Sequence, residues 1–266
     1  MTTVWDIRNF INEICPEKLA FDGDNVGLIV GRKEKVVKKA MITLDVDEKV
    51  VKEAVKYNCD VIISHHPLMF HPIRRLTDSD PMQRALMLLV SNDIALISAH
   101  TNMDCVSGGL NDYLAHKLGI SNTDVIEVVA ESDGIKHGFG RIGEVESCIK
   151  LSDMLNRCIE TLGANSLRYT GDLNKSIKKV AVNCGGGADE LDICISLGVD
   201  LFITGDVKYN PFRDAYESGM AVIDAGHYET EHIVTELFNK FISEKFNEID
   251  LITSAENISV IKYYTK

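Results

Sequence analysis

The chain alternates between short apolar runs and longer amphipathic stretches, and this alternation constrains its fold more than any other feature. Apolar runs typical of buried strands lie at 40–44, 61–63 and 94–97. Apolar positions spaced three or four residues apart predict helices between them, over 50–55 and 82–90. Strands alternating with helices indicate a mostly parallel sheet covered by helices. In such a sheet, ligands bind beyond the carboxyl ends of the strands.

The second half of the chain resembles the first. Without a gap, residues 43–66 align with 183–206, so that Asp60 matches Asp200. Residues 95–104 also resemble 221–231, since each segment has a strand pattern, a histidine and a carboxylate four residues later. An internal duplication explains this similarity, although two unrelated α/β units could also match by chance.

The repeat predicts an α/β fold of two related lobes, with mixed, mostly parallel sheets. We expect the first lobe over 1–125 and the second over 126–266. The C-terminal helix region is expected to pack back towards the first lobe, with a metal site between the lobes.

Composition excludes several classes of protein. A net charge of -12 argues against a general nucleic-acid binder, which needs a basic face, but leaves room for a small anionic substrate. No apolar run approaches the roughly 18 residues of a membrane span, and the N-terminus lacks the pattern of a signal peptide. The seven cysteines form no CxxC pair. The sequence therefore predicts a reduced, cytoplasmic protein without a disulfide framework.

Two adjacent histidines, His65 and His66, follow the predicted strand at 61–63. Pro67 favours an extended conformation for His66 and interrupts the strand, so both rings could turn towards the end of the sheet. Each ring could then bind one ion of a close pair. The alternative is a turn with one ring buried and the other solvated.

Two further histidines each precede a carboxylate by four residues: His100 with Asp104, and His227 with Glu231. On a helix this spacing puts both side chains on one face. Either pair alone is common on protein surfaces. Together with the adjacent histidines at equivalent points of the fold, they predict a site of six metal ligands.

Imidazole and carboxylate ligands suit zinc, iron or manganese, whereas calcium prefers oxygen ligands alone. Six side chains around one ion would leave little room for a substrate, which favours two divalent ions. Asp104, Glu231 or both could bridge them. The ions would lower the pKa of bound water from about 16 to near 7, so that water would be the attacking group.

Other residues are weaker candidates. Arg74, Arg75 and Lys208 are candidates for binding a substrate anion, although exposed loop cations are more common. His71 is expected to be a solvated loop residue. The glycines at 185–187 could hold an anion on their backbone amides or could simply form a tight turn.

These motifs resemble those of the Nif-three-like dinuclear metal-centre family, many of whose bacterial members are called GTP cyclohydrolase I type 2 homologues. The similar segments are DNVGLIVG (24–31), DVIISHHPLMF (60–70), SAHTNMD (98–104), GGLND (108–112), ITGDVKYN (203–210) and DAGHYETE (224–231). They occur in the family's order, and the length resembles its short form. One departure is Gly23, where the family often has Trp.

The resemblance implies metal ligands at His65, His66, Asp104, His227 and Glu231, with His100 as a sixth. It also implies a cytoplasmic homo-oligomer, commonly a hexamer with metal sites facing an internal cavity. We therefore expect a metal-dependent hydrolase acting on a nucleotide or another phosphate-containing small molecule. The alternative is a metal carrier or regulatory protein without turnover.

Overall fold

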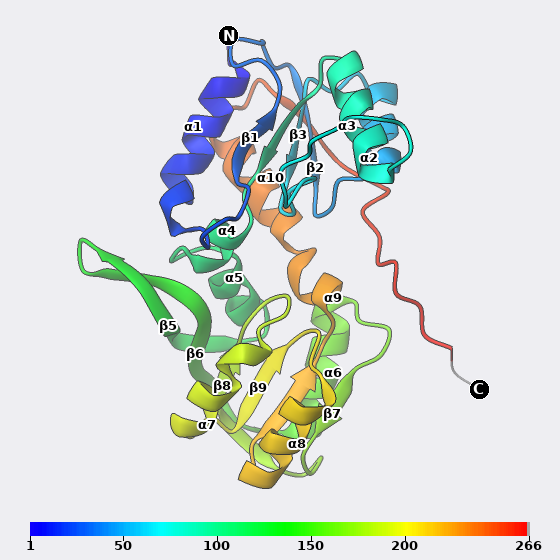
Figure 1. The fold of residues 1–266 in the computed structure, drawn as a ribbon. Helices are drawn as coiled ribbons and strands as arrows, with labels where there is room; N and C mark the ends of the chain where they lie inside the picture. The colour runs from blue at the N-terminus through cyan, green and yellow to red at the C-terminus, as the bar shows by residue number, and fades with distance from the viewer. Residues whose placement is uncertain (265–266) are drawn as a thin grey trace. The chain divides into compact units, whose positions relative to one another are not determined.

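A computed structural model describes residues 1–264, which form two compact units (Figure 1). The first unit comprises Met1–Val106 and Val234–Ile258, and the second comprises Ser107–Ile233 and the residues from Ser259 onward. The predicted lobe boundary at residue 125 lies within strand β5 (Ile120–Ser132). The C-terminal helix α10 (Val234–Lys245) belongs to the first unit.

The first unit is built on a five-stranded sheet. Its strands follow the order β1 (Gly27–Val30), β4 (Ala95–Ser98), β3 (Val61–Ser64), β2 (Lys39–Thr43) and β11 (Asp250–Thr253). The four strands from β4 to β11 run parallel, and β1 pairs antiparallel with β4. Helices α2 (Glu48–Lys56) and α3 (Pro81–Ser91) lie on one side of the sheet, with α1 (Val4–Ile14) and α10 on the other (Figure 1).

The second unit contains a six-stranded mixed sheet. Its order is β5, β6 (Ile135–Lys150), β8 (Ser176–Val182), β9 (Leu201–Thr204), β10 (Ala221–Asp224) and β7 (Arg168–Thr170). Strands β8, β9 and β10 run parallel, while the other pairings are antiparallel. The helices are α5 (Leu110–Lys117), α6 (Leu151–Leu162), α7 (Leu191–Ser196), α8 (Tyr209–Ser218) and α9 (His227–Glu231). The two mixed sheets covered by helices confirm the predicted fold class.

The two units repeat one topology. In each unit, three parallel strands lie side by side, and an antiparallel strand pairs with the outer edge of the third. The aligned aspartates have the same role. One oxygen of Asp60 accepts hydrogen bonds from the backbone amides of residues 38 and 39, and one oxygen of Asp200 accepts from those of 178 and 179. This correspondence of strands and side chains supports the duplication.

Local sequence explains where the helices begin. Thr3 and Asp6 form a reciprocal capping box at the start of α1, as their spacing predicts. Asp47 caps α2 through the amides of its first turn, and Asp80 caps α3 just before Pro81, which needs no amide partner at that position.

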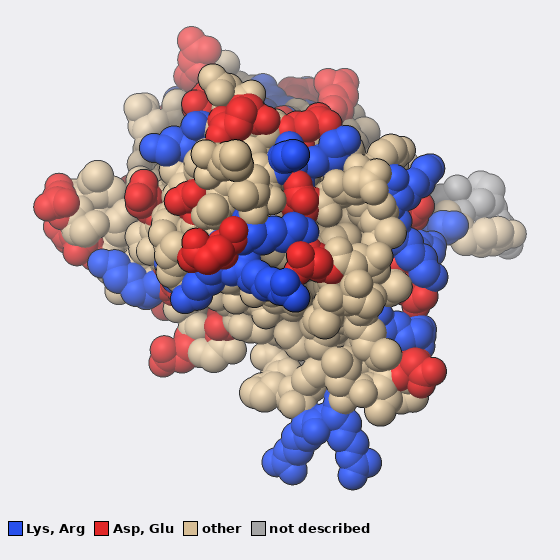
Figure 2. Space-filling model, turned by 90° about the horizontal axis from the view of Figure 1, so that it is seen from above, with Lys and Arg blue, Asp and Glu red and all other residues tan. Residues whose placement is uncertain are grey.

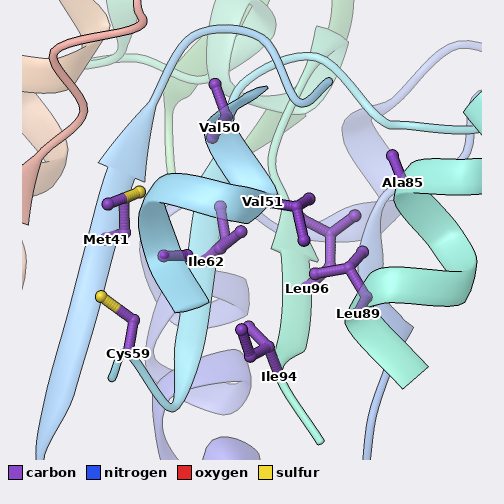
Figure 3. Packing of buried hydrophobic residues seen from close by; sticks show 10 residues of the cluster. Met41, Val50, Val51, Cys59, Ile62, Ala85, Leu89, Ile94 and Leu96 are labelled. Atoms are coloured by element: carbon purple, nitrogen blue, oxygen red, sulfur yellow. The ribbon is translucent and has the colours of Figure 1, made fainter. Parts of the chain in front are cut away.

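Apolar side chains join α2 and α3 to the first sheet (Figure 3). Ile62 of β3 is fully buried between Met41 of β2 and Leu96 of β4, and Val51 and Leu89 reach this layer from the two helices. Burial of such side chains is the main favourable contribution to folding. The core therefore holds the ends of β3 and β4 in fixed register.

The surface carries both signs of charge. On the face shown in Figure 2, blue and red side chains lie next to one another among neutral residues. Within the described part of the chain, none of the helices is long and apolar enough to cross a lipid bilayer.

Candidate metal centre

Three of the predicted histidines follow neighbouring parallel strands of the first unit. β3 ends at Ser64, and His65 and His66 come directly after it. Their backbone amides still donate to the carbonyls of Thr43 and Leu44, at 3.3 and 2.9 Å, so the backbone stays paired beyond the strand. β4 ends at Ser98, and His100 is the N-cap residue of α4 (Thr101–Cys105). Because β3 and β4 are parallel, these histidines meet at one edge of the sheet.

The three rings form one cluster. Ring centroids are separated by 5.1 Å for His65 and His66, 5.2 Å for His65 and His100, and 5.4 Å for His66 and His100. One ring nitrogen of each lies within 4.8 Å of the others, close enough to hold a metal ion. An Asp104 oxygen lies 3.5 Å from the Nε2 of His65, so α4 brings a carboxylate to the same cluster.

Each ring in this cluster is oriented through its Nδ1. The Nδ1 of His65 lies 2.9 Å from the carbonyl oxygen of Ala99, and that of His66 lies 2.8 Å from an Asp45 oxygen. The Nδ1 of His100 lies 3.0 Å from both oxygens of Asp24. Because carbonyl and carboxylate oxygens only accept, each Nδ1 donates a proton, and Nε2 is the nitrogen through which a histidine held in this way binds metal.

Hydrogen bonds from two neighbouring residues hold the Asp24 carboxylate beside His100. This carboxylate also accepts hydrogen bonds from the amide and hydroxyl of Thr101, at 3.2 and 2.5 Å. Burial alone would raise the pKa of Asp24, but the hydrogen bonds from His100 and Thr101 outweigh it and lower the pKa to about 2. Asp24 therefore stays ionised and fixes the orientation of His100.

The second unit carries the other predicted pair on α9. The Nε2 of His227 lies 2.9 Å from an oxygen of Glu231, four residues later on the same helix. The Nδ1 of His227 donates to Asp206 at 2.8 Å. The hydrogen bond to Glu231 raises the pKa of His227 to about 9 against the opposing effect of burial, and Asp206 adds to the rise. At neutral pH His227 is therefore protonated and pairs with Glu231.

The donor sets fit divalent transition metals. All four histidines have Nδ1 engaged by an oxygen, which is the usual arrangement of a histidine that binds metal through Nε2. Each unit adds a carboxylate, Asp104 or Glu231. No cysteine belongs to the three-histidine cluster, so the site differs from a closed structural zinc site.

The glycine turn at 185–187 makes room for Glu231. A Cβ on Gly185 would lie 2.2 Å from a Glu231 oxygen, and this glycine has a φ of +62°. The amide of Gly185 donates to the Thr230 hydroxyl and that of Gly187 to Thr204. These amides are already engaged, which favours the tight-turn interpretation over anion binding.

The remaining predicted residues lie in exposed loops. Arg74, Arg75 and His71 are exposed in the connection between β3 and α3, and Lys208 is the exposed N-cap residue of α8. Among the described residues, no hydrogen bond or ion pair joins the two arginines or Lys208 to the histidines. Their role in binding substrate stays a prediction.

Sequence reasoning missed the three aspartates that orient the rings. Asp24 and Asp206 lie in the segments DNVGLIVG and ITGDVKYN, and Asp45 follows β2. A signal was present, since each aspartate follows or precedes a short strand near a predicted ligand. The duplication gave a second signal, because it aligned Asp206 with His66.

The fold and these side chains define an α/β protein with clusters of histidines and carboxylates able to hold metal ions. Residues 2–261 match the family described as Duf34/NIF3 (NGG1p interacting factor 3), and the chain belongs to that family. The predicted resemblance is therefore confirmed.

Relatives are similar over nearly the whole chain. A Clostridium perfringens protein named GTP cyclohydrolase 1 type 2 homolog is 38% identical over 252 residues, covering 94% of this chain and 95% of the relative. A protein of the same name from Clostridium acetobutylicum is 35% identical and covers 98% of both chains.

Solved structures share the fold. A Staphylococcus aureus hypothetical protein matches with a TM-score of 0.87 and 29% identity, over 98% of this chain and 99% of that chain. A Bacillus cereus protein described as related to NIF3 has a TM-score of 0.88 at 22% identity, over 100% of this chain and 99% of that chain, and supports the fold alone.

Proposed function

We propose that the two His–carboxylate groups together hold two divalent metal ions, and that the protein is a metal-dependent hydrolase. The observation that carries this proposal is the engagement of all four Nδ1 atoms by oxygens. That arrangement needs four specific partners, and it is the one in which Nε2 is the ring nitrogen that binds metal. Histidines held only for packing would have no need of it.

In the proposed centre, the Nε2 atoms of His65, His66, His100 and His227 and the carboxylates of Asp104 and Glu231 would hold the two ions of zinc, iron or manganese. The ions would polarise the substrate and lower the pKa of water. Asp45, Asp24 and Asp206 keep the rings in the tautomer that binds metal. Asp104 and Glu231 offset the positive charge of the ions.

The substrate class follows from charge and from the relatives. Two divalent cations attract an anion in spite of the net charge of -12. The name GTP cyclohydrolase 1 type 2 homolog, carried by the relatives, suggests a nucleotide. We propose a nucleotide or another phosphate-containing small molecule as substrate. Arg74, Arg75 and Lys208 are proposed to bind its anionic groups.

A turnover assay tests the proposal. Metal-loaded protein is incubated with GTP and with a panel of phosphoesters, beside the Asp104→Asn variant. Asp133→Asn is a matched control, because Asp133 is exposed in a turn with a φ of 52° that asparagine also adopts. The proposal predicts turnover in the wild type and in Asp133→Asn, with a loss of at least about 100-fold in Asp104→Asn. Equal turnover in all three proteins would contradict it.

We further propose that the protein works in the cytoplasm as a homohexamer whose metal centres face an internal cavity. Light scattering coupled to size exclusion should give about six times the chain mass of 29.5 kDa. A monomer at micromolar concentration would contradict this assembly.

A further inference from the structure

The second unit has a pocket formed by the edge strand β7 and helix α8. Its volume is about 470 Å³, within the range of about 300 to 1,000 Å³ that small-molecule sites occupy. The lining residues all lie on these two elements: Arg168, Tyr169, Thr170, Tyr209, Phe212, Arg213 and Tyr216. The pocket combines four aromatic rings with two guanidinium groups.

The aromatic side of the pocket comes from the outer face of α8. Tyr209, Phe212 and Tyr216 recur at helical spacing, whereas Ala215 is the buried residue of this helix. Tyr209 is 75% exposed and Tyr216 is 70% exposed. Phe212 also packs against the core of the second unit, whereas the rings of Tyr209 and Tyr216 are largely exposed beside the pocket. Large exposed rings gathered around one hollow are a feature of binding sites rather than of an ordinary solvated helix face.

The cationic side of the pocket has hydrogen-bonding capacity to spare. The Nη2 of Arg168 donates hydrogen bonds to the Val207 carbonyl and the Asp224 carboxylate. Its Nε and Nη1 groups can therefore donate to a ligand. Arg213 pairs with Glu217 at 2.9 Å, but both side chains are exposed and such pairs contribute little to stability. The Arg213 guanidinium can therefore turn to a bound anion at small cost.

We propose that this pocket binds a planar aromatic anion of the nucleoside monophosphate class. The heterocycle would stack on the rings of α8, since every base has a π-face that tyrosine can cover. The phosphate would pair with Arg213 and Arg168, whose planar donors match its oxygens. The proposal does not depend on the metal centre, because every contributing residue lies on β7 or α8.

Calorimetric titration of the full chain with GMP, guanosine and inorganic phosphate tests the proposal. GMP should bind more tightly than either fragment, because the pocket offers both a stacking face and cations. Tyr216→Ala and Arg213→Ala should each weaken GMP binding by about tenfold or more, since one stacked base or one phosphate contact carries that much affinity. Tyr216→Phe keeps the ring and should bind nearly as the wild type does.

Two controls locate the binding. Tyr57→Ala removes a tyrosine of the first unit and should leave the affinity unchanged. Arg168 is not substituted, because its bond to Asp224 supports the loop that carries Asp206. His65→Ala, which disables the proposed metal centre, should still bind GMP. Binding that is lost in His65→Ala but kept in Tyr216→Ala and Arg213→Ala, or no binding of GMP at millimolar concentration, would overturn the proposal.

Discussion

Asp206 accepts a hydrogen bond from the Nδ1 of His227 at 2.8 Å, although the two residues follow different strands, β9 and β10. The carboxylate fixes the tautomer and orientation of the ring. We expect Asp206→Asn to weaken metal binding by about 10- to 100-fold, because a neutral amide accepts the Nδ1 hydrogen bond less strongly than a carboxylate and can present its NH2 group instead. Competition with a fluorescent chelator measures this affinity.

Asp192→Asn serves as the control for that experiment, since Asp192 is an exposed residue of α7 in the same unit. It should bind metal as the wild type does. Equal affinity in Asp206→Asn and Asp192→Asn would show that the ring does not act through this hydrogen bond.

Gly185 is expected to tolerate no side chain. An alanine Cβ there would lie 2.2 Å from a Glu231 oxygen and 3.3 Å from the Cε1 of His227, so Glu231 must move. Gly185→Ala should therefore lose metal as well as stability. Gly163→Ala is the matched control: its φ of +67° is similar, but a Cβ meets nothing within 4 Å. It should lose about 1 kcal/mol of stability and keep its metal, as measured by urea unfolding and elemental analysis.

Asp60 and Asp200 are expected to contribute equally to stability. Each accepts two backbone amide hydrogen bonds at the start of a parallel strand pair. Asp60→Ala and Asp200→Ala should each lower the free energy of unfolding by about 1–3 kcal/mol, because the amides lose a charged acceptor. Urea denaturation followed by circular dichroism measures this, with the exposed Asp78→Ala as control. A clear loss in only one variant would count against equivalent roles.

The stability of the first unit should be sensitive to substitutions that leave a cavity in its hydrophobic core. Ile62 is 0% exposed and packs between two strands and α2 (Figure 3). Ile62→Ala should destabilise the protein by about 2–5 kcal/mol, since the lost contacts leave a cavity. Val90→Ala on α3 removes a side chain that is 60% exposed and should change stability by less than about 0.5 kcal/mol. Similar unfolding midpoints for both variants would contradict this packing.

Much of the fold follows from periodicity. The predicted strand at 61–63 is β3, and the one at 94–97 is β4, because fully buried parallel strands appear as continuous apolar runs. His65, His66 and His100 could be placed together because parallel strands share their carboxyl edge. These features depend on local pattern and one topological rule.

Other features depend on long-range pairing. β7 has only three residues, and its partner β10 lies more than 50 residues further on, so no local pattern marks it. The long β5–β6 hairpin is an antiparallel pairing, which the alternation of strands and helices does not predict. Its turn at Asp133 and Gly134, with φ values of 52° and 76°, was a missed signal, because Asp-Gly favours a tight hairpin. Asp24, Asp45 and Asp206 were missed because a single loop aspartate has no period.

Anomalous diffraction from crystals of manganese- or zinc-loaded protein tests the central claim most directly. We expect two metal peaks within about 4 Å of each other, the spacing of two-metal sites, with ligands from both histidine–carboxylate groups. Asp104 and Glu231 should then both contact metal. A single peak, or carboxylates of Asp104 and Glu231 more than about 10 Å apart, would contradict a shared centre, because metal–oxygen bonds near 2 Å cannot span that gap.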